Sequence, residues 1–296
     1  MARNLWWLGA RTCIHTALFA FLLAGPAQVA AQQTSNSSPA QEDPGAGETK
    51  AGTDDREAED SGLEAMAADT DPTKPVIFSF RNEFYDLKQG LWKNVNIFRA
   101  DKAVLEKTEL PGRTRGFILR ADVPVVTFYN GDDTEAGLGD MYGQALCAPR
   151  IRGPFFLAVG TGLVLPTADY NLGLGLGKYI IAPAVVPVVF IPRRGLAYVK
   201  IQDWVSFAGK SVPLDVHYLT ITPRILWRLS KRWWMLVDEE SLTDWEKGSK
   251  TNYKAGFLVG FMLTRRMGIS VQAEIPFGAY RQGDWTIKTL FFRTKY

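Results

Sequence analysis

A two-residue alternation of apolar with small or polar side chains runs through most of residues 76–296 and constrains the fold more than any other feature. In the stretch YKAGFLVGFML (253–263), every odd position is apolar, whereas the even positions include Lys254 and two glycines. The stretch MGISVQAEIPF (267–277) repeats the pattern. Because successive side chains of a strand point to opposite faces, this period predicts β-strands rather than helices. No stretch after Pro75 has 18 uninterrupted apolar residues, so transmembrane helices are not expected.

The alternation predicts twelve strands, most of them longer than strands in globular proteins. Globular strands usually have about five or six residues, whereas a tilted strand needs roughly 9 to 11 to cross a bilayer. The predicted ranges are about 76–85, 93–100, 114–126, 138–149, 154–165, 178–191, 196–208, 215–229, 232–241, 252–264, 267–277 and 284–296.

Alternation alone leaves open which face is inside. In a soluble sandwich or a lipocalin-like barrel the apolar face forms the core, whereas in an outer-membrane barrel it meets lipid and the polar face lines the lumen. The connections favour the membrane barrel, because the tight basic turns RG, PRRG, SKR and TRR alternate with longer loops. Residues 101–113 depart from this pattern, as a long connection where a short turn is expected.

Aromatic residues near the predicted strand ends agree with a membrane barrel, since such side chains concentrate at the level of the lipid headgroups. They are Tyr253, Phe277, Trp227, Phe155, Trp233 and Trp234. We therefore predict an all-β fold, a transmembrane antiparallel up-and-down β-barrel of about 12 strands formed by residues 76–296.

The residues before the barrel divide into two parts. Residues 1–31 have the pattern of a secretory signal peptide, with Arg3 and Arg11 before a short apolar run and small residues up to Ala31. Residues 32–75 contain 11 acidic and 3 basic residues and no aromatic residue, which predicts a disordered acidic linker. Residues 76–296 then hold 29 basic and 20 acidic residues, so the barrel itself is expected to be basic.

The last predicted strand, DWTIKTLFFRTKY, ends on a terminal tyrosine. Pairing of this strand with the first would remove the free edge of the sheet. Leu290, Phe292 and Tyr296 resemble the assembly signal that the barrel insertion machinery recognises, and an even strand number places both chain ends in the periplasm. The expected location is the outer membrane of a Gram-negative cell, with its lipids and the insertion machinery as partners.

One region resembles a known family. The stretch GLGDMYGQALCAPR is followed by GPFFLAVGTGLVLPTADYNLGLGLGKYIIAPAVVPVV. Over about 60 residues this resembles the outer-membrane transporter family first linked to the meta-cleavage pathway of phenol degradation. Tyr179 and Ala182-Pro183 depart from the tryptophan and glycine-proline that are usual there. The matching positions are Gly137, Leu138, Gly139, Asp140, Leu165, Pro166, Thr167, Leu174, Gly175, Gly177 and Lys178. The resemblance implies a channel or uptake protein, whose solute the family name does not define.

The sequence offers little for catalysis. His217 is the one histidine after residue 31, and Leu219 stands where the barrel lipases carry a serine. We expect His217 on the lipid-facing side at the outer rim. Asp203, Asp238, Glu239 and Glu240 supply carboxylates, but no His–Asp pairing is predicted, and no metal-ligand cluster is visible. The run LGLGLGK lacks the spacing of a phosphate loop and predicts a flexible outer loop. No enzyme activity, metal, cofactor or nucleic-acid partner is expected.

The predicted lumen carries the functional candidates. By parity, the inward-facing set includes Arg81, Glu83, Arg120, Asp122, Asp140, Tyr142, Gln144, Tyr198, Lys200, Gln202, Trp204, Tyr218, Thr220, Thr222, Arg224, Arg228, Lys254, Gln272 and Glu274. The aromatic members suit an aromatic solute, and the basic excess favours anions. Two functions remain open: a passive channel or transporter for small solutes, hydrophobic or aromatic ones included, and a non-conducting structural or anchoring barrel whose charged side chains pair and plug the lumen.

Overall fold

The computed structural model of the chain describes residues 76–107, 114–192, 194–211 and 215–294. The predicted signal peptide and acidic linker, and Tyr296, lie outside the described residues. Two short 3-10 turns occur, at Lys88–Gly90 and Tyr170–Leu172. No helix in these ranges is both long enough and apolar enough to span a bilayer. The strands are β1 (Val76–Asp86), β2 (Trp92–Lys107), β3 (Thr114–Tyr129), β4 (Thr134–Leu138), β5 (Met141–Arg152), β6 (Phe155–Leu165), β7 (Lys178–Ile191), β8 (Gly195–Gly209), β9 (His217–Arg228), β10 (Trp233–Asp244), β11 (Lys250–Met262), β12 (Met267–Phe277) and β13 (Trp285–Thr294).

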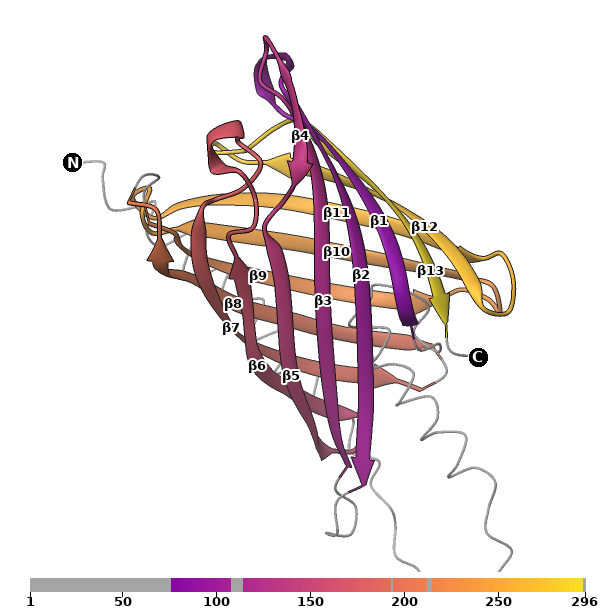
Figure 1. The fold of residues 1–296 in the computed structure, drawn as a ribbon. Coiled ribbons are helices and arrows are strands. Elements are labelled where there is room, and N and C mark those ends of the chain that lie inside the picture. Colours follow the sequence, from indigo (N-terminus) through magenta and orange to yellow (C-terminus); the bar gives the residue numbers. More distant parts are fainter. Residues whose placement is uncertain (1–75, 108–113, 193, 212–214, 295–296) are drawn as a thin grey trace, which may run out of the picture. The chain divides into compact units, whose positions relative to one another are not determined.

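The strands form one closed antiparallel ring. Long strands that are adjacent in the chain pair with each other, and β1 pairs with β13 from Phe78 opposite Arg293 to Asp86 opposite Trp285. Figure 1 shows β1 and β13 side by side. The short β4 stands outside the ring, because it pairs only with the end of β3. Twelve strands therefore close the barrel, which confirms the predicted fold class.

Several predicted strand boundaries were wrong by three residues or more, and two of them change which residues form loops. The long connection expected at 101–113 is mostly strand, because β2 continues to Lys107 opposite Thr114 of β3. The charged residues of this segment obscured the alternation of apolar with polar side chains, because the inner face of the strand is itself charged. The strand expected at 138–149 begins at Met141, because Gly139 and Asp140 separate β4 from β5.

The two faces of the sheet are inverted relative to a water-soluble barrel. On β12, Ser270, Gln272 and Glu274 are buried inside, whereas Ile275 is 62% exposed on the outer face. Phe257 on β11 is likewise 50% exposed. Soluble monomers rarely expose large continuous apolar surfaces, whereas a membrane barrel must present an apolar band to lipid. The barrel thus carries its apolar surface outside and its polar side chains inside.

One predicted interface aromatic was misplaced. Trp233 and Trp234 are adjacent on β10, so their side chains point to opposite faces. Trp233 is exposed on the outer face, but Trp234 is fully buried inside, with its ring 5.5 Å from that of Phe292. Period two allows only one of two neighbouring tryptophans to reach the lipid headgroups.

A charge placed mid-strand on the outer face should be costly. Val271 and Met267 both point outward from β12, but Val271 lies mid-strand and Met267 is its first residue. We expect Val271→Arg to lower the free energy of unfolding by about 2 to 4 kcal/mol in lipid vesicles, and Met267→Arg by at most about 1 kcal/mol. Denaturant titration followed by tryptophan fluorescence measures both. Equal effects would contradict the outward placement of Val271 at membrane depth.

Candidate functional site

Two arginine–aspartate pairs join β2 to β3 on the inner face. Arg99 donates from Nε and Nη2 to the two carboxylate oxygens of Asp122, each at 2.7 Å. Arg120 donates from Nε to Asp101 at 2.9 Å. Each pair joins residues that lie directly opposite in the strand register. Asp122 and Arg120 were predicted lumen residues, whereas Arg99 and Asp101 were missed, although their period-two spacing was the available signal.

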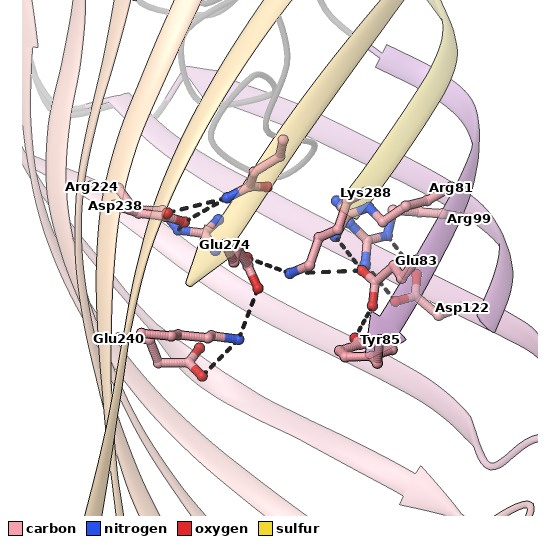
Figure 2. Close-up of polar contacts among 12 residues, drawn as sticks. Arg81, Glu83, Tyr85, Arg99, Asp122, Arg224, Asp238, Glu240, Glu274 and Lys288 are labelled. Atoms are coloured by element: carbon pink, nitrogen blue, oxygen red, sulfur yellow. Dashed lines mark hydrogen bonds and ion pairs between the residues drawn. The ribbon is translucent and has the colours of Figure 1, made fainter. Parts of the chain in front are cut away.

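A chain of alternating charges crosses from β10 to β1. Lys254 Nζ lies 3.1 Å from Glu240 and 3.4 Å from Glu274, and Lys288 Nζ donates to Glu274. Lys288 also lies 4.0 Å from Glu83 on β1. Figure 2 shows Lys288 between the two carboxylates. The chain therefore spans the seam where β13 meets β1. Of these five residues, Glu83, Lys254 and Glu274 were in the predicted lumen set. Glu240 was named only as a possible catalytic carboxylate, and Lys288 was not predicted.

A third group of contacts lies on β9, β10 and β12. Arg224 Nε is 3.1 Å from Asp238, and the Gln272 amide donates to both oxygens of Asp238 at 3.1 and 3.2 Å (Figure 2). Such buried charges are tolerated only when they are paired and hydrogen-bonded.

A cavity of about 260 Å³ lies inside the barrel, bordered by part of this network. Its charged lining is unbalanced, because Glu240 is the one carboxylate among the described lining residues. The cationic lining residues are Arg81, Arg99, Arg120, Lys200 and Arg224. The cavity is therefore a basic compartment, although four of these cations are ion-paired with acids that do not line it, namely Glu83, Asp122, Asp101 and Asp238.

Aromatic side chains form another part of the cavity wall. The rings of Trp204 and Tyr218 are stacked, with centroids 5.6 Å apart at an interplanar angle of 19°. The ring of Tyr142, which is not a lining residue, lies 5.6 Å from that of Trp204, and its hydroxyl accepts a hydrogen bond from Gln202. Trp204 Nε1 donates to Thr220 at 3.2 Å, which fixes the plane of the indole. All five residues belong to the predicted lumen set.

An apolar layer fills the inner face toward the end of the barrel that carries the short turns. Trp234 packs there in a glycine-made recess, since a Cβ at Gly260 would lie 2.0 Å from the indole. Members of the buried cluster that form this layer are Phe156, Phe190, Leu196, Leu226, Trp234, Leu258, Met262, Leu290 and Phe292. The two-residue alternation placed several of these positions on the inner face. The predicted lumen residues, however, included only polar and aromatic side chains, so these apolar positions were left out. We call this set the apolar floor.

The residues of the family resemblance meet in the outer loop between β6 and β7. Asp140 accepts hydrogen bonds from the backbone N–H groups of Ala168 (3.2 Å) and Leu176 (2.6 Å). Thr167 donates to the Gly139 carbonyl at 2.7 Å. Asp140 thus anchors the loop and is not part of the cavity lining. The loop is packed rather than free, as Leu174 is 3% exposed against Val95 and Val126, so the expected flexible loop was wrong.

The remaining motif residues support this arrangement. Gly137 and Leu138 lie in β4, Leu165 ends β6, and Pro166 begins the loop. A Cβ at Gly175 would lie 2.4 Å from the Ala168 Cβ, which explains a glycine there. Gly177 has φ +66°, and Lys178, the first residue of β7, donates to Asp215 at 2.8 Å. This hydrogen bond holds the pKa of Asp215, in the loop before β9, below its usual range.

The remaining predicted residues lie in different parts of the barrel. Arg228 donates to the Ser230 carbonyl at 3.0 Å in the turn after β9. Tyr198 lines the cavity beside Arg224, to which it is hydrogen-bonded. Leu290 and Phe292 point inward into the apolar floor, and their role as an assembly signal stays a prediction.

His217 lies at the outer rim, where it was expected. Its Nε2 is 3.5 Å from Asp203, and its ring is 6.2 Å from Trp245. A His–Asp pair therefore exists that the sequence did not predict, because cross-strand register between β8 and β9 brings the two residues together. Within the described ranges, no group of three or more histidine, cysteine, aspartate or glutamate side chains is placed to hold a metal ion.

Comparison with known proteins gives the fold. The sequence matches no protein-family profile and no curated protein. An outer membrane channel from Pseudomonas putida F1 has a TM-score of 0.54 at 12% identity, covering 74% of this chain and 96% of that chain. The NanC porin has a TM-score of 0.49 at 8% identity, covering 73% of this chain and 98% of that chain. Outer membrane phospholipase A from Escherichia coli has a TM-score of 0.44 at 8% identity, covering 80% of this chain and 99% of that chain. Both are too distant to carry an argument. The similarity to the Pseudomonas channel shows the fold, an outer-membrane type of barrel, and does not confirm the phenol meta-pathway family.

Substituting one partner of a buried ion pair should lower the free energy of unfolding more than substituting both partners. Arg99→Met leaves Asp122 buried without its bidentate partner, and we expect a loss of about 3 to 5 kcal/mol in unfolding free energy. The double variant Arg99→Met/Asp122→Leu should fall within about 1 kcal/mol of the wild type, because no uncompensated charge remains. Urea unfolding in micelles measures both. A double variant as unstable as the single one would show that the pair is not an isolated structural unit.

Proposed function

We propose that this chain is an outer-membrane channel for the passive uptake of small solutes, hydrophobic or aromatic ones included. The observation that carries the proposal is the cavity, a polar compartment with an aromatic wall enclosed by the inner face of the barrel. A channel needs no reaction chemistry, only a lined path and weak binding along it. The proposed location is the outer membrane, with its lipids and the insertion machinery as partners.

Passage would depend on the apolar floor. Trp234 and Phe292 close part of the inner space beneath the cavity, with their rings packed edge to face. We propose that these side chains must move for a solute to reach the periplasm. A floor of apolar side chains admits uncharged or amphipathic solutes more readily than hydrated ions, because it offers no polar partner to a desolvated charge.

A structural or anchoring barrel is the second candidate, and a specific observation favours it. The ion-pair network joins five consecutive strands across the closing seam, from Glu240 on β10 to Glu83 on β1. Together with the apolar floor, such a network resembles a packed core more than an open pore. In this reading the charges serve to hold the ring in one register.

A hydrolase is not part of the proposal. The His217–Asp203 pair lies on the outer face, and Leu219 stands where the membrane lipases place a serine. A histidine–aspartate pair without an activated nucleophile or water lacks the third member that acyl transfer requires.

Single-channel recording on the refolded protein separates the two candidates. We expect discrete conductance steps with an anion preference, which Arg224→Gln and Lys200→Gln reduce because they remove positive charge from the cavity wall. Trp234→Ala should raise the step size by opening the floor. Arg281→Gln, in the loop after β12, is the control and should change neither property.

The contradicting result is equally specific. A folded barrel that conducts neither as the wild type nor as Trp234→Ala would favour the structural candidate.

A further inference from the structure

We infer that the cavity binds a small organic acid, a carboxylate attached to a planar apolar ring. This inference rests on the proposed function, because it takes the cavity as a stopping point of the solute, and it adds the chemical class of that solute. Three features of the lining carry it: the charge imbalance, two buried donors, and the stacked aromatic wall.

The charge imbalance is fixed by geometry rather than by mobile side chains. Arg99 is held by Asp122 through two of its nitrogens, and Arg120 is held by Asp101. Asp122 and Asp101 do not line the cavity, so they orient the guanidinium groups without filling the space before them. An anion entering the cavity therefore meets pre-oriented cations, and arginine is well suited to carboxylate recognition.

Two buried donors point to an acceptor that the protein does not supply. Arg99 Nη1 and Gln144 Nε2 have no hydrogen-bond partner among the residues that the structure describes. Both residues line the cavity, and both are buried, at 6% and 7% exposure. Arg99 and Gln144 lie on β2 and β5, on either side of β3. Because buried donors are normally satisfied, a carboxylate that accepts from both would remove their desolvation cost.

The aromatic wall and the size of the cavity define the rest of the ligand. Trp204 and Tyr218 present stacked rings, a surface that favours a planar apolar group. The cavity volume of about 260 Å³ is below the roughly 300 to 1,000 Å³ typical of drug-sized ligands. One ring with one carboxylate is the appropriate scale, and an oligosaccharide is too large.

Calorimetric titration with benzoate tests the inference. The protein is the refolded full chain in micelles at neutral pH. We expect saturable benzoate binding that is at least about tenfold tighter than that of phenol, which lacks the charge, or of inorganic phosphate, which lacks the ring. Phenol binding as tightly as benzoate would overturn the role of the cations. Phosphate binding as tightly would overturn the role of the aromatic wall.

Variants place the ligand in the cavity. Gln144→Leu removes one donor and leaves every ion pair intact, so it should weaken benzoate binding about tenfold, the scale of one hydrogen bond to a charged acceptor. The charge-balanced Arg99→Met/Asp122→Leu variant should weaken it further. Trp204→Leu should reduce the preference for benzoate over cyclohexanecarboxylate. The control Arg281→Gln should bind as the wild type does. Unchanged binding in all three cavity variants would place the site elsewhere and overturn the inference.

Conductance of the same preparation distinguishes the inference from the proposed function. A barrel that conducts but shows no benzoate binding would refute the organic-acid site and leave the channel standing. Saturable benzoate binding that Gln144→Leu weakens, in a barrel without conductance, would support the site and refute the channel.

Discussion

Closure of the sheet is the constraint on which the rest of this structure depends. A bilayer offers no hydrogen-bond partners to backbone N–H and C=O groups, so a membrane sheet must leave no free edge. The pairing of β1 with β13 meets that requirement over most of the length of β1. The side chains support the same seam, since Lys288 on β13 bridges Glu274 on β12 and Glu83 on β1. Backbone pairing and ion pairing therefore act at one place, where the first and last strands of the ring must meet.

Once the ring is closed, its inner face must be filled or solvated, and the chain does both. Paired charges and amides occupy the middle, an aromatic wall and a basic cavity adjoin them, and the apolar floor lies toward the short turns. A narrow barrel leaves little bore, so long side chains can fill much of it. The apolar floor would slow hydrated ions more than an amphipathic solute, without abolishing ion conductance. It also explains why the same structure is compatible with a plugged barrel.

The sequence predicted the architecture because the two-residue alternation depends only on whether each side chain is apolar or polar, and not on its exact identity or contacts. Strand number, closure and the inverted faces all followed from alternation and turn length. The extension of β2 beyond Ala100 did not follow, because Asp101 and Lys102 gave no apolar face to detect. The sequence also did not predict which side chains pair with each other. The pairing of His217 with Asp203 depends on the register of β8 with β9, which no local pattern encodes.

The candidate site was predictable as a set of positions and not as an arrangement. Parity placed Arg120, Tyr142 and Trp204 on the inner face, but it treated that face as uniformly polar. The inward tryptophan of β10 was assigned to the lipid interface, since two adjacent tryptophans look alike in a sequence. Asp140 was assigned to the lumen, although it anchors the outer loop through two backbone N–H groups. Such roles depend on contacts between distant residues.

The most direct test of the inverted, polar-centred barrel is thiol accessibility in vesicles, with Cys13→Ser/Cys147→Ser as the cysteine-free background. Single cysteines at Lys200→Cys and Thr222→Cys should react with a charged, water-soluble maleimide, because both positions line the cavity. Their strand neighbours, Val199→Cys and Ile221→Cys, should be protected by lipid. Reaction at the second pair with protection at the first would mean that the apolar face is the core, and the account of a membrane barrel with a solvated interior would be wrong.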